Sequence, residues 1–352
     1  MSNIDRTLKN VYESIMPERG DLEKLLLLDD EAEVRSLFIF ADEVRKKFMG
    51  DGIALRGIVE FSNFCRNRCF YCGLNKDNKG LARYTLTDRE IAESVRALVL
   101  SGVKTVVLQS GEDDGLDPEW LSGMIRMIKA NFGIAITLSV GERTRREYEM
   151  WRDAGADRYL LKIETSDRNL YDSLHAGMDF DNRVRCLKDL KELGYQTGSG
   201  VMVGLKGQTP RSLAEDILFF KRWDFDMIGI GPFIPHAQTR LSGERHGDEM
   251  MTLKMVALTR IMTKSAHVPA TTALGSLARD FRVDALKAGA NVLMPNFTPK
   301  DYKKLYEIYP NKRCVDESTE LCIPCIETMA SSIGRTIEYS RGDSLRRDPV
   351  LT

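Results

Sequence analysis

The sequence predicts an α/β fold, a complete (β/α)8 TIM-type barrel. Strand-like runs alternate with helix-like segments between residues 50 and 310. Three helical segments end at Gly155, Gly194 and Gly289, where a left-handed residue commonly closes a helix. Eight parallel β/α units make a barrel of roughly 250 residues, which this span matches. The strands are expected at 53–62, 105–111, 134–140, 158–164, 197–204, 227–235, 268–275 and 292–297, with helices between them, for example at 88–100, 144–154, 183–193, 212–222, 252–262 and 280–288.

Two further segments flank the predicted barrel. Residues 1–49 carry apolar side chains at helical spacing, and Asp21 is the expected N-cap of the helix that contains Leu25. We therefore expect a helical cover at 1–49, the barrel at 50–310, and a cysteine-containing tail at 311–352.

Composition narrows the class of partner. The 352 residues include 51 Lys and Arg and 52 Asp and Glu, so a net charge of -1 gives no reason to expect nucleic acid or an anionic membrane as the partner. No run approaches the roughly 18 apolar residues of a membrane span, and the N-terminus lacks an export signal. Seven cysteines do not resemble a secreted disulfide framework. A cytoplasmic protein with a small-molecule substrate in a pocket is expected.

Three cysteines follow the first predicted strand directly. Cys65, Cys69 and Cys72 have the spacing C-x3-C-x2-C, which can bind three irons of a 4Fe-4S cluster and leave the fourth iron open. A zinc site is the alternative, although the local triplet lacks the fourth ligand that zinc usually takes. This run resembles the radical SAM superfamily, in which the open iron chelates the amino and carboxylate groups of S-adenosylmethionine (SAM).

The resemblance implies further SAM contacts where barrel strands end, which is where barrel enzymes carry their chemistry. Ser110-Gly111-Glu112 ends the second strand and resembles the Gly-Gly-Glu motif that receives the methionine amino group of SAM. A glycine there lets backbone approach a ligand closely, and an ordinary loop is the alternative. Tyr71 is expected near the adenine, or else as a hydrophobic plug beneath the cluster.

The fourth strand brings two opposite charges to one face. Lys162 and Glu164 both point into the barrel by the period of two. Buried charges are costly unless they are paired or used. Glu164 can accept hydrogen bonds from SAM, and Lys162 can bind a substrate carboxylate; a mutual ion pair is the alternative. Arg183 resembles the family arginine that grips the SAM carboxylate.

The fifth and sixth strands are rich in glycine, which indicates that a flat ligand or another backbone comes close. The resemblance makes that ligand the adenine of SAM, with Met202, Ile230 and Pro232 as expected contacts. The seventh strand carries Thr271 and Thr272, which would line the barrel interior where a small substrate can sit. Alternatively, these two hydroxyls bond to each other.

The tail contains a second cysteine group, Cys314, Cys322 and Cys325. The spacing x7-x2 can hold a second iron-sulfur cluster with one non-cysteine ligand, or zinc. Because the group follows no strand end, we expect it near the surface with no required role in the central reaction. Cys186, on an apolar helix face, is expected in the core.

A denser resemblance connects the chain with HydE, the family of iron-iron hydrogenase maturases, and more distantly with biotin synthase and methylornithine synthase. It implies a small sulfur-containing or amino-acid-derived substrate, attacked by a 5′-deoxyadenosyl radical from SAM. It also implies an electron donor such as flavodoxin or ferredoxin, and other hydrogenase maturation proteins as partners. The segments that carry it are 60–65, 72–74, 108–113, 229–236, 269–273 and the tail cysteines.

Two departures from that family fall on the substrate side. The chain has Lys162-Ile163-Glu164 where the family has Arg-His-Glu, and Leu174-His175-Ala176 where it has Leu-Arg-Pro. Lysine cannot reproduce a bidentate guanidinium contact. A paralogue or an amino-acid mutase of the methylornithine synthase type therefore stays open. From another class, so does a non-catalytic iron-sulfur scaffold.

Overall fold

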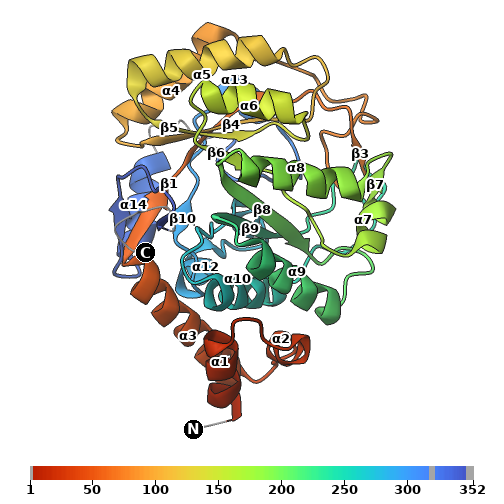
Figure 1. Ribbon diagram of the computed structural model, residues 1–352, viewed down its shortest axis with the longest axis vertical. Coiled ribbons are helices and arrows are strands. Elements are labelled where there is room, and N and C mark those ends of the chain that lie inside the picture. The colour runs from red at the N-terminus through yellow and green to blue at the C-terminus, as the bar shows by residue number, and fades with distance from the viewer. Residues whose placement is uncertain (1–2, 317–321, 346–352) are drawn as a thin grey trace.

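The computed structural model describes residues 3–316 and 322–345, so parts of the expected tail lie outside the described residues. At its centre, six parallel strands form one sheet in the order β2-β4-β5-β6-β8-β9, with helices on the outside (Figure 1). Every residue of β2 is buried, as expected of a parallel strand covered by helices. The six strands are β2 (Gly57–Ser62), β4 (Thr105–Ser110), β5 (Ala135–Ser139), β6 (Arg158–Leu160), β8 (Gln196–Val203) and β9 (Met227–Pro232).

A second, three-stranded sheet has the order β10-β1-β11. It contains β10 (Val292–Leu293), β1 (Gly52–Leu55) and β11 (Thr336–Glu338). Only Arg56 separates β1 from β2, so the expected first strand is present as two consecutive pieces. Strand β10 pairs in parallel with β1 at Val292 and Leu293. Single parallel bridges make the other connections between β9 and β2: Met227 with His267, Pro269 with Val292, and Ile58 with Asn296.

The helices begin and end largely where the sequence indicates. Thr87 and Thr144 each form a capping box with the glutamate three residues later, which satisfies the free N–H groups of the first turn. Gly155, Gly194 and Gly289 all have positive φ, which confirms the expected helix exits. The helices that follow strands are α4 (Asp88–Leu100), α5 (Pro118–Phe132), α6 (Arg145–Asp153), α7 (Arg168–Leu174), α8 (Phe180–Glu192), α9 (Pro210–Trp223), α10 (Glu249–Thr263) and α12 (Arg282–Lys287).

Some local expectations were wrong. The strands expected at 158–164 and 292–297 are shorter, because β6 ends at Leu160 and β10 at Leu293. The run 268–275 is not a strand, because Thr272–Gly275 forms the short helix α11 after Thr271. Threonine favours both strands and helix starts, so its propensity does not separate the two. Helix α2 (Arg19–Leu26) starts after Glu18, and Asp21 lies in its first turn rather than at its N-cap. A carboxylate in the first turn still interacts favourably with the helix dipole.

The two ends of the chain pack against the outer surface of the barrel region (Figure 1). Helix α3 (Glu31–Met49) contacts α10, and α2 contacts α9. In the tail, β11 pairs in parallel with β1 at the edge of the three-stranded sheet. No helix in the described ranges is long and apolar enough to cross a membrane. The remaining elements are α1 (Asn3–Glu13), α13 (Lys300–Lys303), α14 (Cys322–Ser331) and the antiparallel pair β3 (Arg68–Cys69) and β7 (His175–Ala176).

Candidate active site

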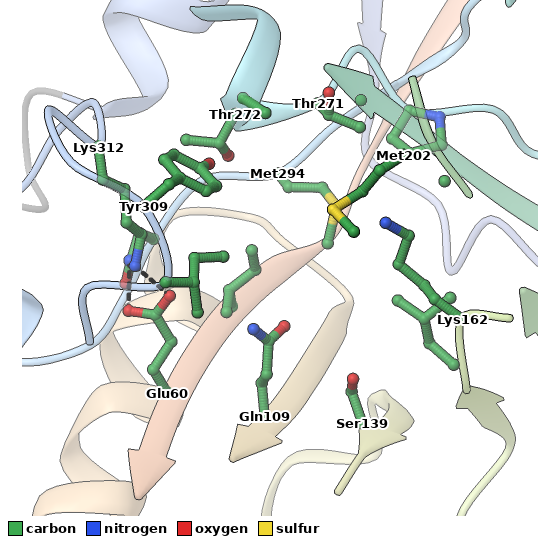
Figure 2. Close-up of a pocket in the computed structure, with 18 of the residues that line it drawn as sticks. Glu60, Gln109, Ser139, Lys162, Met202, Thr271, Thr272, Met294, Tyr309 and Lys312 are labelled. Atoms are coloured by element: carbon green, nitrogen blue, oxygen red, sulfur yellow. Dashed lines mark hydrogen bonds and ion pairs between the residues drawn. The ribbon is translucent and has the colours of Figure 1, made fainter. Parts of the chain in front are cut away.

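A cavity of about 390 Å³ lies among the C-terminal halves of the central strands (Figure 2). Its wall runs from the cysteine loop after β2 to the tail segment before α14. Five predicted residues do not line it: Cys65, Cys69, Gly111, Ile230 and Cys325. Those that do are Tyr71, Cys72, Ser110, Glu112, Lys162, Glu164, Arg183, Met202, Pro232, Thr271, Thr272, Cys314 and Cys322.

The three cysteines of the first group are half-buried on one loop. Burial and, after it, repulsion from the neighbouring Cys65 raise the pKa of Cys72 to about 12. Burial, followed by repulsion from Cys72 and Cys65, also raises the pKa of Cys69 well above its usual range. Metal coordination is what makes such thiols deprotonate, so this donor set fits an iron-sulfur cluster. In the ranges that the structure describes, no three His, Cys, Asp or Glu side chains are placed to hold a single metal ion.

Two features shape the cysteine loop. The Arg83 guanidinium donates hydrogen bonds to the carbonyls of Asn63 (2.6 Å), Leu74 (2.9 Å) and Asn75 (2.8 Å), and so ties the ends of the loop together. Gly111, at the end of β4, lies directly against the loop. A Cβ there would lie 2.2 Å from the Phe64 carbonyl oxygen, which explains why the position needs glycine.

Arg183 lies at the cavity wall in a group of carboxylates. Its Nε is 2.7 Å from Oε1 of Glu142, and its Nη1 donates to the Lys162 carbonyl at 3.2 Å. Burial opposes its charge, but Glu142 and other anions raise the pKa of Arg183 well above its usual range. Glu112 accepts a hydrogen bond from the Glu142 backbone N–H at 2.7 Å. Glu142 was not predicted, although its position just after β5 could have indicated it.

Lys162 and Glu164 form an ion pair of 2.9 Å, so the alternative of a mutual pair is realised (Figure 2 shows Lys162 at the wall). Glu164 has a φ of 64°, a left-handed conformation that is uncommon without glycine. The loop that follows is held by Asp216 on α9, whose Oδ1 accepts from the Ser166 N–H (2.6 Å) and hydroxyl (2.7 Å). Burial raises the pKa of Asp216 to about 7.

The two threonines lie at the start of α11 and line the cavity together (Figure 2). The Thr271 hydroxyl donates to the Ile230 carbonyl at 3.1 Å rather than to Thr272, so the two hydroxyls do not simply bond to each other. The Ile230 side chain is fully buried. Its neighbours Gly229 and Gly231 line the cavity instead, so β9 presents backbone there.

The opposite end of the cavity contains an ion pair that the sequence did not indicate. Glu60 on β2 pairs with Lys312 from the tail (Figure 2), and Asn296 donates to Glu60 Oε2 at 3.0 Å. Cys322 is buried, and with Cys314 it lines this same end, so of the three tail cysteines only Cys325 has the exposed position that was expected. A hydrogen bond with Cys314 lowers the pKa of Cys322 to about 7.

Comparisons with known proteins agree with this geometry. Residues 59–220 match the family model of the radical SAM superfamily. The FeFe hydrogenase maturase subunit HydE of Thermotoga maritima is 51% identical over 90% of this chain and 91% of its own length. The 3-methylornithine synthase of Methanosarcina acetivorans is 30% identical over 86% and 85%, respectively.

Solved structures share the fold. The crystal structure of methylornithine synthase (PylB) superposes with a TM-score of 0.82 and 26% identity, covering 96% of this chain and 98% of that one. That of HydG, a maturase of the FeFe hydrogenase, reaches the same TM-score at 19% identity, which shows the fold alone. Membership of the superfamily implies a 4Fe-4S cluster and SAM. The chain is therefore a radical SAM enzyme and belongs to the family of HydE.

Proposed function

We propose that this enzyme acts in the maturation of the FeFe hydrogenase active site, on a small sulfur-containing or amino-acid-derived substrate held in the cavity. The observation that carries this proposal is the continuity of the cavity, whose wall includes Tyr71 and Cys72 at one end and Lys312 and Cys314 at the other. A volume of about 390 Å³ is in the range of small-molecule sites. The relative with 51% identity is a hydrogenase maturase.

Cys65, Cys69 and Cys72 hold the cluster in this proposal. When bound, the cluster and SAM supply an electron and a 5′-deoxyadenosyl group for radical chemistry. The protein's own residues bind and orient SAM. The Arg183 guanidinium attracts the SAM carboxylate, and the carboxylates of Glu112 and Glu164 attract its amino and hydroxyl groups. The other contacts are Tyr71, Ser110, Met202 and Pro232, which line the cavity. Gly111 and Ile230 do not line it, and they support these contacts through the backbone beside Ser110 and Gly231.

Lys162, Thr271 and Thr272 serve the substrate. The lysine ammonium can leave Glu164 for a substrate carboxylate because a flexible four-carbon stem carries it. The wall of the cavity carries five basic side chains against three acidic ones, which favours an anionic substrate. The basic residues are Lys162, Arg183, Arg282, Lys312 and Arg313, and the acidic ones are Glu60, Glu112 and Glu164.

The proposed function also involves the tail cysteines, the closure of the barrel and the cellular setting. Cys314, Cys322 and Cys325 hold an auxiliary iron-sulfur cluster, supported by the contact between the first two thiols. The segments bridged at His267, Pro269 and Asn296 complete an eight-stranded barrel within residues 50–310, between the helical cover and the tail. The enzyme works in the reducing cytoplasm with an electron donor such as flavodoxin or ferredoxin, alongside other hydrogenase maturation proteins.

The test is hydrogenase activation in an anaerobic cell extract that lacks HydE. Addition of the reconstituted protein is expected to restore hydrogenase activity. Lys162→Met is expected to lose most of that activation while it still forms 5′-deoxyadenosine from SAM and dithionite. Lys188→Met, at an exposed lysine on α8, is the matched control. Cleavage of SAM without any hydrogenase activation by the wild-type protein would instead favour a mutase of the methylornithine synthase type, which the altered Lys162-Ile163 pair permits.

A further inference from the structure

The second half of the cysteine loop is held by the segment that follows α7. Strand β3 pairs antiparallel with β7, so that Cys69 lies opposite His175. The Phe70 N–H donates to the Leu174 carbonyl at 3.0 Å. The His175 side chain is 1% exposed, so water does not compete for its ring nitrogens.

The His175 ring joins two tyrosines. Its Nδ1 lies 2.8 Å from the Tyr171 carbonyl oxygen, and its Nε2 lies 2.8 Å from the Tyr71 hydroxyl. A carbonyl oxygen only accepts hydrogen bonds, so Nδ1 carries the hydrogen. In the neutral ring Nε2 then has only a lone pair, and the Tyr71 hydroxyl must donate to it. The hydrogen bonds therefore fix the tautomer of His175 and the direction of the Tyr71 O–H bond.

Ring packing fixes the same arrangement. The His175 ring stacks on Tyr171 with centroids 4.0 Å apart and an interplanar angle of 22°. It meets Tyr71 edge-on at 5.4 Å and 81°. Tyr71 itself lines the cavity directly before Cys72. A tyrosine held at its hydroxyl and packed at a steep angle against the His175 ring has one orientation in the cavity wall, and its O–H hydrogen is occupied by His175.

We propose that His175 is a positioning residue that sets the affinity of the enzyme for SAM by holding Tyr71 in this orientation. A preorganised aromatic side chain binds the nucleoside part of SAM without first losing rotational freedom. The inference rests on the proposed contact between Tyr71 and SAM. The inference does not depend on the role in hydrogenase maturation, because its test measures SAM binding with no hydrogenase and no substrate present.

Two amide substitutions separate the two hydrogen bonds of the ring. His175→Gln places an amide oxygen near the position of Nε2, where it can still accept from Tyr71. His175→Asn reaches only the position of Nδ1, so it keeps the bond to Tyr171 and loses the bond to Tyr71. The dissociation constant of SAM is measured by equilibrium dialysis on the reconstituted holoenzyme without reductant, and iron content is measured on the same samples.

His175→Asn and Tyr71→Phe are each expected to raise the dissociation constant about three- to tenfold, the effect of one buried hydrogen bond. His175→Gln is expected to stay within about twofold of wild type, with unchanged iron in all variants. The double variant Tyr71→Phe/His175→Asn is expected to bind SAM no more weakly than Tyr71→Phe alone, because both changes remove the same hydrogen bond.

Other outcomes overturn the proposal in distinct ways. If Tyr71→Phe binds SAM as wild type does, the hydrogen bond between the Tyr71 hydroxyl and His175 does not set the affinity, and the proposed role of His175 fails. If Tyr71→Phe weakens binding but His175→Asn does not, only the role of His175 fails. If the two increases in the dissociation constant of SAM multiply in the double variant, His175 acts independently of Tyr71. Loss of iron from His175→Asn or His175→Gln would show that His175 holds the loop rather than the hydroxyl.

Discussion

The two ends of the cavity are built in different ways. At the cluster end, Cys65, Cys69 and Cys72 lie within eight residues, and Gly111 and Arg183 join them from nearby strand and helix ends. At the tail end, Glu60 on β2 meets Lys312, which is 252 residues away in the sequence. The three cysteines are thus encoded locally, whereas Gly111 and Arg183 reach them only through the fold. The other end of the cavity is completed by a segment that is distant in the sequence.

The largest expected effect is at the cluster end. Gly111→Ala places a methyl group 2.2 Å from the Phe64 carbonyl oxygen and 2.8 Å from Cys65 Cβ, so the cysteine loop has to move. We expect the variant to lose most of its cluster iron and with it the formation of 5′-deoxyadenosine. Gly123→Ala on α5 is the control, because nothing lies within 4 Å of its added Cβ. It should keep its iron and gain about 0.5–1 kcal/mol in stability. Full iron loading of Gly111→Ala would contradict the tight packing described for this end.

A smaller effect, on stability rather than chemistry, is expected at the tail end. Lys312→Met leaves the Glu60 carboxylate, 2% exposed, without its cation. Removal of one partner of a buried pair costs about 3–5 kcal/mol, which urea unfolding measures. The double variant Glu60→Gln/Lys312→Met should recover most of that loss. Molecules of these variants that carry the first cluster should cleave SAM at the wild-type rate. A single variant as stable as wild type would show that the pair does not hold the tail to β2.

Between the two ends, Asp216 supports the loop after Lys162 and Glu164, and its effect depends on pH. Burial raises the pKa of Asp216 to about 7 from its usual 3.8. The folded protein then binds a proton that the unfolded chain releases near pH 4, so this contribution is fully present below pH 4 and is lost as the pH rises to about 7. The loss is on the order of 2–4 kcal/mol. Asp216→Asn should flatten the fall in unfolding free energy between pH 5 and pH 8. An identical fall in wild type and variant would count against the buried, protonated carboxyl.

Local patterns explain how much of the site could be predicted. The cysteine spacing is contiguous and needs no tertiary contact. The period of two predicted that Lys162 and Glu164 share one face. Both residues lie beyond β6, which ends at Leu160, and Glu164 is left-handed, yet the two side chains meet as an ion pair. The strand-end rule located Ser110 and Glu112 and could have located Glu142. Such rules rest on neighbours in sequence, so they hold before any tertiary contact is known.

The remaining features depend on contacts that no local pattern contains. Lys312 follows the predicted barrel in a segment without periodicity, and its partner Glu60 reads as an ordinary strand residue. The burial of Cys322 follows from the same return of the tail toward β2. The strand expected at 268–275 continued the alternation of strands and helices, whereas tertiary context made Thr272–Gly275 a helix.

In our proposal, radical generation takes place at one end of the cavity and is independent of the tail cysteines at the other. The most direct test measures 5′-deoxyadenosine, formed from SAM and dithionite, for the wild type, Cys69→Ala and Cys314→Ser/Cys322→Ser after anaerobic reconstitution. Rates are normalised to the iron of the first cluster. We predict that Cys69→Ala forms none and that the tail variant forms as much as the wild type. Loss of SAM cleavage in the tail variant, with the first cluster intact, would contradict the account.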